Sequence, residues 1–254
     1  MTTQPTFTRE TPRGVCEEID ITIFVPCYNE EKRIVPTLET VRAAMAEISV
    51  SYEVIVVDDG STDRTAAVVE TYCSEHKQMP VILHRNPRNL GLSRSFVDTA
   101  FLGRGRFYRL VCGDNVEPKE SLLKILREMG TADILVPYYP LLPGKSAARK
   151  FISSLYTQIV NLLSGYTLNY YNGCALYRRF DVMRWASYNY GFGFQAHLIT
   201  TLIGEGATYK EIPLEGFHLV KDRGSPLNIR NFLSTGHTLI EILVRRVRRT
   251  VYSN

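Results

Sequence analysis

The chain has 254 residues, of which 44% are hydrophobic and 22% charged, and its formal net charge is +4. This length allows one sizeable core, and the modest charge gives no indication of a nucleic-acid partner. The five cysteines form no CxxC pair, which argues against a zinc knuckle or a disulfide framework. Because the sequence shows neither an apolar secretory signal nor roughly 18 uninterrupted apolar residues, we expect a cytoplasmic protein without a membrane-spanning helix.

Residues 1–19 are polar and are expected to form a disordered leader. Beyond them, short β-branched runs alternate with longer helical patterns. The predicted strands are 21–25, 52–57, 81–83, 107–111 and 134–136, and the predicted helices are 30–46, 62–73, 93–102 and 120–129. Such alternation predicts an α/β fold, Rossmann-like, with a mostly parallel sheet flanked by helices. In such a sheet, ligands bind at the carboxyl ends of the strands.

The pattern changes near residue 140, where a break rich in proline and tyrosine precedes two amphipathic segments, 146–163 and 232–249. The second segment also carries Arg245, Arg246, Arg248 and Arg249. An interfacial helix places its apolar face in lipid and its arginines near anionic headgroups, so we expect both segments to contact a membrane surface. The alternative is that both helices pack on the sheet while the arginines face water.

Polar motifs follow the first two predicted strands. The first strand leads into VPCYNEEKRI and the second into VIVVDDGSTDRT. Helix capping by Ser61 or Thr62 and Asp63 would explain part of the second motif. Capping does not explain Asp58 and Asp59, two adjacent acids at the end of a very apolar strand, and these favour a ligand site.

These motifs, together with NLGLSRSF and the acidic turn after the fourth strand, resemble those of the family 2 glycosyltransferases of the GT-A fold. The later stretches NGCALYRR and KDRGSPLN resemble, more loosely, the branch that includes dolichol-phosphate mannose synthase and polyprenyl-phosphate glycosyltransferases. The resemblance implies an enzyme that binds a UDP- or GDP-linked sugar. The donor-binding residues that it implies are Pro26, Tyr28, Glu30, Asp58, Asp59, Gly91, Gly113 and Asp114.

Asp114 matches the last aspartate of the family's D-x-D motif, which implies that it holds Mg²⁺ or Mn²⁺ against the donor diphosphate. The chain departs from this motif because Cys112 and Gly113 stand where the family usually has Asp and Ala. One aspartate, phosphate oxygens and water can still complete a Mg²⁺ site. Since Gly-Asp-Asn is also ordinary turn chemistry, a plain turn residue is the alternative for Asp114.

Inverting transfer to a hydroxyl group needs a general base, commonly Asp or Glu. Where many relatives have that acid, this chain offers Gln195, which cannot take a proton, and His197, a lone histidine of the kind that is more often structural. A phosphate-monoester acceptor is already anionic and needs no base, so a lipid phosphate is favoured. The acceptor-binding residues implied by the resemblance are Arg149, Asn172, Lys221, Arg223 and Ser225.

We therefore expect an inverting glycosyltransferase that moves a sugar to a polyprenyl phosphate at the inner face of a membrane, with Asp114 and Arg223 as catalytic residues. Two alternatives are a transferase acting on a saccharide hydroxyl in cell-surface glycan synthesis, and a non-catalytic nucleotide-sugar-binding subunit of a membrane complex. The expected organisation is a leader at 1–19, a glycosyltransferase domain at 20–228 divided into a donor half (20–118) and an acceptor half (119–228), and a basic amphipathic helix at 229–254.

Overall fold

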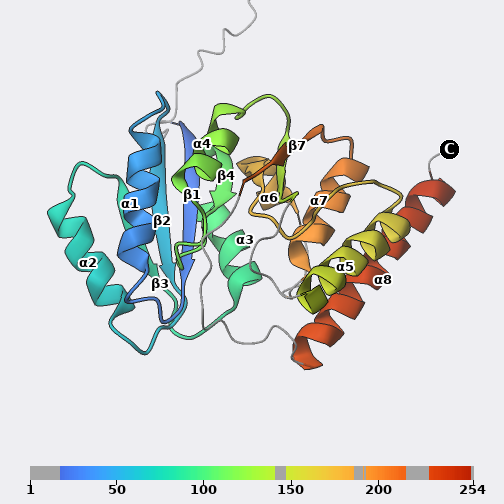
Figure 1. Cartoon of the computed structure of the whole chain (residues 1–254), viewed down its shortest axis with the longest axis horizontal. Helices are drawn as coiled ribbons and strands as arrows, with labels where there is room; N and C mark the ends of the chain where they lie inside the picture. The colour runs from blue at the N-terminus through green and yellow to red at the C-terminus, as the bar shows by residue number, and fades with distance from the viewer. Residues whose placement is uncertain (1–17, 141–146, 186–190, 192, 216–228, 253–254) are drawn as a thin grey trace, which may run out of the picture.

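The computed structural model of the chain describes residues 18–140, 147–185, 191, 193–215 and 229–252, with only the backbone for 229–232. Most of the expected leader therefore lies outside the described residues, and the first strand begins at Ile19. Within the described residues, a seven-stranded sheet forms the centre, and helices cover both of its faces (Figure 1).

The strand order is β3-β2-β1-β4-β6-β5-β7. β6 runs antiparallel to its neighbours β4 and β5, and the other neighbouring pairs are parallel. The mostly parallel sheet predicted from the sequence is thus confirmed. The strands are β1 (Ile19–Cys27), β2 (Tyr52–Asp58), β3 (Val81–Arg85), β4 (Gly105–Leu110), β5 (Ile134–Tyr138), β6 (Leu176–Arg178) and β7 (Tyr209–Pro213).

Two hydrophobic layers hold the helices on the sheet. β1 and β2 are buried along almost their whole length, as expected of parallel strands covered on both faces. Ile34 and Leu122 belong to the layer on one face, and Phe96 and Leu198 belong to the layer on the other. The helices are α1 (Ile34–Met45), α2 (Thr65–Glu75), α3 (Leu92–Leu102), α4 (Lys119–Arg127), α5 (Ala147–Ser164), α6 (Arg179–Arg184), α7 (Phe194–Gly204) and α8 (Ile229–Tyr252).

The two predicted amphipathic segments form α5 and α8, which lie side by side and away from α2 (Figure 1). α8 packs against both α5 and α7, and its inward residues Thr238 and Ile242 are buried. Its outward residues, such as Ile240 and Val251, are apolar and exposed. The helices therefore pack on the domain with one face and present a second apolar face outward. None of the helices in the described part of the chain combines the length and the apolar content needed to cross a membrane.

Candidate active site

Three adjacent strand ends bring the sequence motifs together. β1 pairs with β2 and with β4, so that Cys27 lies opposite Asp58 and Phe24 lies opposite Leu110. The loops that follow these strands therefore begin at one edge of the sheet. This carboxyl edge is where open α/β sheets bind ligands.

Hydrogen bonds join the loops after β1 and β2 into one unit. Asn29 N donates to Ser61 Oγ at 2.9 Å, and Thr62 N donates to Asn29 Oδ1 at 2.8 Å. Glu30 N donates to Thr65 Oγ1 at 2.8 Å. These contacts engage the polar residues of both motifs in the loops. The helices α1 and α2 therefore begin at Ile34 and Thr65, later than the predicted starts at 30 and 62.

Asp63 makes one contact within its own loop and one contact with the neighbouring loop. Its Oδ1 accepts from Thr65 N at 2.9 Å, and its Oδ2 accepts from Glu31 N at 3.2 Å. One carboxylate oxygen therefore closes a local turn before α2, while the other ties the second loop to the first. The N-cap residue of α2 is Arg64, which makes no side-chain capping hydrogen bond, so the helix capping predicted at this motif is not observed.

Asp59 holds the loop that follows β3. Its Oδ1 accepts from Asn86 Nδ2 at 2.7 Å and from Leu90 N at 2.9 Å, while its Oδ2 accepts from Gly91 N at 2.9 Å. Gly60 allows this close approach, since its φ is +75° and a Cβ there would lie 2.7 Å from the backbone of the same loop. The structure thus gives Asp59 and Gly91, both predicted to bind the donor, a mutual contact that positions this loop.

Asp58 differs from Asp59 in that one of its carboxylate oxygens makes no hydrogen bond among the described residues. Its Oδ1 accepts from Ser61 N at 3.0 Å, and among the described residues its Oδ2 makes no hydrogen bond. A carboxylate oxygen is a pure acceptor and suits the N–H of a nucleobase. Tyr28, on the neighbouring loop, is 47% exposed. A hollow of about 310 Å³ on the joined loops is lined by Asn29, Glu30, Glu31, Lys32, Arg33 and Asp63.

The C-G-D turn is anchored to β1 and α1. Gly113 N donates to Pro26 O at 3.2 Å, and a Cβ on Gly113 would lie only 2.6 Å from that oxygen. Asn115 accepts at Oδ1 from Thr40 Oγ1 at 3.1 Å. Between these anchors, Asp114 is 7% exposed. Glycine at 113, where the family usually has alanine, therefore has a steric reason in this chain.

We expect Gly113→Ala, which introduces the residue usual in the family, to weaken donor binding. The added methyl group must push the turn away from Pro26 O, at a cost of about 1–3 kcal/mol in stability. Urea unfolding and nucleotide titration of the variant measure both effects. Unchanged stability and affinity would show that the turn has room for a side chain.

A buried ion pair closes the base of this turn. Arg109 in β4 is fully buried, and its Nη2 donates to Oε1 of Glu117, which is also buried. Burial disfavours the charge of Arg109, but Glu117 outweighs this effect and holds the pKa of the guanidinium above its ordinary value. The turn that carries Asp114 is therefore fixed at its two ends by one buried contact.

Asp114 is the hard ligand that the turn offers to a cation. Among the described residues, no three His, Cys, Asp or Glu side chains are grouped to hold a metal ion. Cys112 Sγ lies 3.9 Å from Cys174 Sγ, and a thiol is too soft to prefer Mg²⁺. The residues therefore fit a cation that would arrive with the donor diphosphate, whose oxygens and bound waters would supply the other ligands.

The predicted acceptor residues are described only in part. Arg149 is exposed in the first turn of α5, and Asn172 lies between α5 and β6. Asn172 Oδ1 is buried without a hydrogen bond among the described residues. Lys221, Arg223 and Ser225 lie outside the described residues, so the catalytic role of Arg223 stays a prediction.

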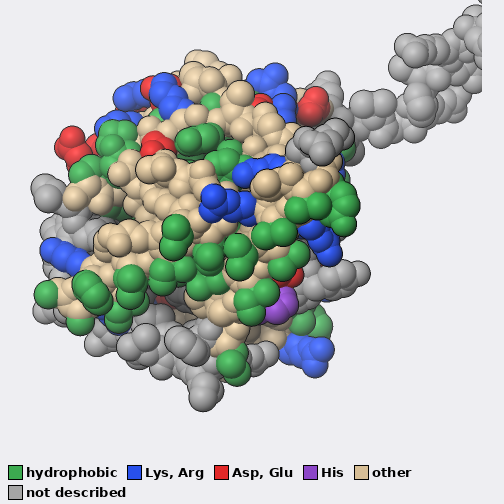
Figure 2. All heavy atoms as spheres, turned by 90° about the vertical axis from the view of Figure 1, so that its right-hand side faces the viewer, with side chains coloured by type: hydrophobic (Ala, Val, Ile, Leu, Met, Phe, Trp, Pro, Cys, Tyr) green, Lys and Arg blue, Asp and Glu red, His purple; other side chains and the backbone are tan. Residues whose placement is uncertain are grey.

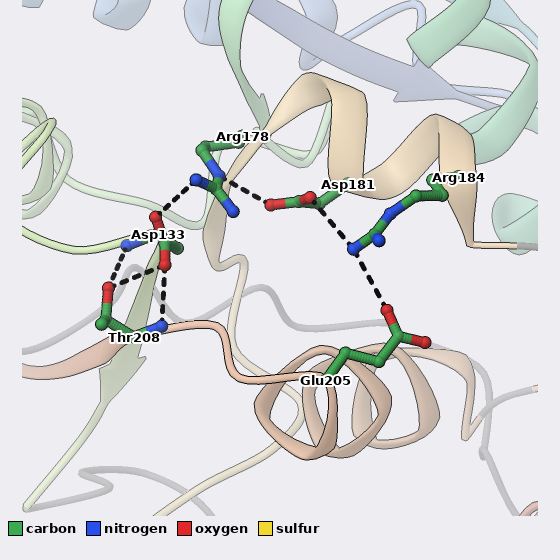
Figure 3. A network of polar contacts seen from close by, with 6 residues as sticks. All are labelled: Asp133, Arg178, Asp181, Arg184, Glu205 and Thr208. Carbon is green, nitrogen blue, oxygen red and sulfur yellow. Dashed lines mark hydrogen bonds and ion pairs between the residues drawn. The ribbon is translucent and has the colours of Figure 1, made fainter.

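Arg178 and Arg179, at the end of β6, are engaged within the fold. Arg178 lies between Asp133 and Asp181, at 2.9 Å and 2.7 Å respectively (Figure 3). Arg179 Nη1 donates to Ala100 O at 3.0 Å. Because β6 is antiparallel to β4, its end lies at the sheet edge opposite the C-G-D turn. These two arginines therefore stabilise the fold and are not placed to bind an acceptor phosphate at the candidate site.

His197 lies in the core. It is 2% exposed, Trp185 Nε1 donates to its Nδ1 at 3.1 Å, and its Nε2 lies 3.5 Å from Glu241 Oε2. Burial lowers the pKa of His197 to about 4, although Glu241 opposes this shift. The structural role that the sequence favoured for this histidine agrees with these contacts.

His197 should make the fold less stable as the pH falls. The unfolded chain binds a proton below the ordinary pKa of 6.5, whereas the folded histidine stays neutral down to about 4. The free energy of unfolding therefore has its full value above about pH 6.5, and about 2–3 kcal/mol of it is lost near pH 4.5. Urea unfolding at about pH 7.5 and pH 4.5 measures the loss, and His197→Gln should reduce it. An identical pH dependence in the variant would contradict a histidine that is held neutral.

The family model for glycosyl transferase family 2 matches residues 22–185. The chain belongs to this family. It is 31% identical over 161 residues to the dolichyl-phosphate beta-glucosyltransferase ALG5C of Trichomonas vaginalis, a match that covers 57% of this chain and 47% of that protein. It is 29% identical over 164 residues to the dodecaprenyl-phosphate galacturonate synthase of Rhizobium johnstonii, covering 63% and 47% respectively. The chain thus spans about half the length of these relatives.

Among solved structures, the mannosyltransferase PcManGT of Pyrobaculum calidifontis, in complex with GDP-Man and Mn²⁺, superposes with a TM-score of 0.62. The match covers 93% of this chain and 71% of that one at 16% identity. A likeness at this identity shows the fold alone. This member of glycosyl transferase family 2 accordingly has the GT-A fold that its motifs predict.

The sequence patterns did not reveal several residues that shape the candidate site of this family 2 member. Asn86 supports Asp59, and Thr40 anchors the C-G-D turn through its neighbour. The pair of Arg109 and Glu117 was also missed, although an arginine inside the apolar run FYRLV was a visible signal. The first two residues gave no comparable signal, because their importance comes from contacts made far along the chain.

Proposed function

We propose that this glycosyltransferase transfers a sugar, with inversion, from a UDP- or GDP-linked donor to a polyprenyl phosphate at the inner face of a membrane. The observation that carries the proposal is the set of interlocked loops at one sheet edge, which brings Asp58 and the turn of Asp114 to the same place. The matched relatives are named for dolichyl and dodecaprenyl phosphates, which supports this class of acceptor.

On the donor side, each acid takes one part of the nucleotide. The free oxygen of Asp58 accepts an N–H from the base, and Asp59 keeps the loop at Gly91 in place around it. Asp114 would hold Mg²⁺ or Mn²⁺ against the diphosphate. A cation at this place offsets the negative charge that grows on the departing nucleoside diphosphate. The anchored turn fixes the carboxylate before the donor arrives, so little reorganisation is needed.

On the acceptor side, no base is required. Gln195 cannot take a proton, and His197 is enclosed in the core. A phosphate monoester is anionic at neutral pH, so its oxygen attacks the anomeric carbon directly while the bond to the diphosphate oxygen breaks. Attack from the side opposite the leaving group inverts the configuration. Arg149 and Arg223 are the cations that we assign to the acceptor phosphate and the leaving diphosphate.

The proposed organisation keeps residues 20–228 as the catalytic domain and 229–254 as a basic amphipathic helix. The exposed apolar side chains of α5 and α8, among them Phe151, Leu162 and Val247, support contact with a membrane surface. A lipid-linked acceptor lies in such a surface, so this contact brings the enzyme to its substrate.

Transfer from labelled UDP-glucose and GDP-mannose to a short polyprenyl monophosphate in detergent tests the proposal. The matched control acceptor is the polyprenol without phosphate. We expect label in the lipid only with the phosphate, and a product of opposite anomeric configuration to the donor. Label in a saccharide acceptor alone would favour a hydroxyl-directed transferase. Nucleotide binding without consumption of any donor would favour a non-catalytic subunit.

A further inference from the structure

A hollow of about 520 Å³ lies between the ends of α5 and α7 and the C-terminal half of α8. Ser164, Thr200 and Thr201 contribute hydroxyl groups to its lining. Thr201 is 5% exposed, and its Oγ1 has no hydrogen-bond partner among the described residues. The lining is therefore polar on the side of the domain that α8 covers.

This hollow lies at the opposite end of the sheet from the donor site. α7 ends at the hollow and is followed by β7, whose first residue, Tyr209, pairs with Ile134 at the start of β5. β5 points in the same direction as β4, so the starts of these strands lie opposite the C-G-D turn. The donor and acceptor phosphates of the proposed reaction are consequently not its ligands.

Four arginines of α8 line the hollow, and two of them hold the helix in place. Arg246 Nη1 donates to Leu162 O, and the Arg249 guanidinium lies 5.0 Å from the centre of the Tyr166 ring. Arg245 and Arg248 form no ion pair or hydrogen bond among the described residues. These two are cations at the hollow without an assigned partner.

Two acids also line the hollow, and each contacts side chains outside its lining. Glu205 Oε2 lies 3.1 Å from Arg184 Nη2 (Figure 3). Glu241 Oε2 lies 3.5 Å from His197 Nε2 and 3.8 Å from His237 Nδ1. Because Glu205 is paired outside the hollow, the four arginines leave a net positive charge inside it.

The hollow opens beside an exposed apolar surface. Ile240 and Val244 belong to its lining and also to the outward face of α8, where they are 63% and 41% exposed. Val247 and Val251 continue this face toward the end of the helix. Figure 2 shows the hydrophobic side chains gathered in a band across this side of the molecule, with basic side chains beside it.

We infer that the hollow binds the phosphate headgroup of an anionic membrane lipid, with the acyl chains along the apolar face of α8. Arginine pairs with phosphate through two parallel hydrogen bonds. The Thr201 hydroxyl adds a donor, whereas those of Ser164 and Thr200 donate to backbone carbonyls. An apolar surface next to a basic hollow matches a lipid in both of its parts. The inference rests on the membrane contact of the proposed function and assigns a ligand to it, separate from the acceptor.

Vesicle binding of Arg245→Gln/Arg248→Gln tests the inference, with vesicles of phosphatidylcholine containing or lacking phosphatidylglycerol. Each arginine near an anionic surface contributes about fivefold, so we expect a loss of about 25-fold on the anionic vesicles. The matched control, Arg85→Gln/Arg127→Gln, removes the same charge from exposed ion pairs elsewhere and should change binding less than about twofold. Equal losses in both variants, or no loss in the first, would overturn the inference.

A second readout separates this inference from the proposed function. Nucleotide binding, and transfer to a short acceptor in detergent, should be unchanged in Arg245→Gln/Arg248→Gln, because the hollow lies away from the donor edge. A chain that binds vesicles through these arginines but binds no nucleotide would support the inference and contradict the proposed function. Binding of inorganic phosphate without any preference for anionic vesicles would overturn the assignment to a lipid.

Discussion

Asp114→Ala is expected to lower turnover by roughly two to three orders of magnitude while the fold stays intact, the range found when one group that stabilises developing charge is removed. Asp114 is the hard ligand at the C-G-D turn, and the family's first acid is replaced by Cys112. The turn keeps its other anchors in the variant, since Gly113 still contacts β1 and Asn115 still contacts α1. Turnover with the donor at saturating Mg²⁺ measures the effect.

The matched control for this variant is Asp98→Ala. Asp98 is an exposed aspartate of α3 whose Oδ2 lies 2.6 Å from Arg94 Nε of the same helix. This ion pair involves no residue of the C-G-D turn. It should retain normal turnover and a stability within about 0.5 kcal/mol of the wild type. Near-normal turnover in Asp114→Ala would contradict the role of this residue in holding the cation. If Asp114→Ala lowers both turnover and the free energy of unfolding in urea, Asp114 stabilises the fold instead.

Glu117→Leu is expected to destabilise the fold by about 3–5 kcal/mol, because it leaves the buried charge of Arg109 without its partner. Nothing else among the described residues forms an ion pair with that guanidinium. The free energy of unfolding in urea measures the loss. The effect should be far larger than that of breaking an exposed pair such as Lys119 with Glu47.

The double variant Arg109→Leu/Glu117→Leu separates the charge from the packing. Replacing both members of a buried pair by apolar residues is often neutral, so most of the lost stability should return. We expect the double variant to bind the donor more weakly than the wild type, since the turn no longer has its tie to β4. A Glu117→Leu loss below about 1 kcal/mol would show that the pair does not stabilise the fold. Full donor affinity in the double variant would show that the pair does not position the turn.

The donor half of the fold was predictable because its local patterns agree with its long-range partners. The apolar runs at 21–25 and 52–57 are long enough to be read as buried strands, and they extend to Ile19–Cys27 and Tyr52–Asp58 in the structure. Each ends in a polar motif, and parallel pairing then brings both motifs to one edge. The meeting of the two polar motifs at one sheet edge thus follows from two short apolar runs and their parallel pairing.

The division of labour between Asp58 and Asp59 could not be predicted in this way. The two aspartates are adjacent and chemically identical, so no sequence pattern distinguishes their roles. The structure separates them because Asn86 and Gly91, in the loop after β3, both donate to Asp59. Contacts of this kind depend on where a loop lies, and no local pattern reports that.

The acceptor half was harder for a related reason. β6 has three residues, Leu176–Arg178, and its antiparallel direction follows from its connections and not from its composition. The direction matters, since it carries Arg178 to the opposite edge and into an ion pair with Asp133. The first of the two arginines that end the motif NGCALYRR thereby stabilises the fold.

Isothermal titration of the chain with UDP and GDP, each with Mg²⁺, with Mn²⁺ and with EDTA, tests the donor site at this sheet edge directly. We expect binding that is selective for one base and strengthened by the metal, with no binding of the metal alone, because no three His, Cys, Asp or Glu side chains among the described residues are grouped to hold a cation by themselves. Asp58→Asn should weaken the base selectivity. Absence of binding by both nucleotides under every condition would contradict a donor site at this sheet edge.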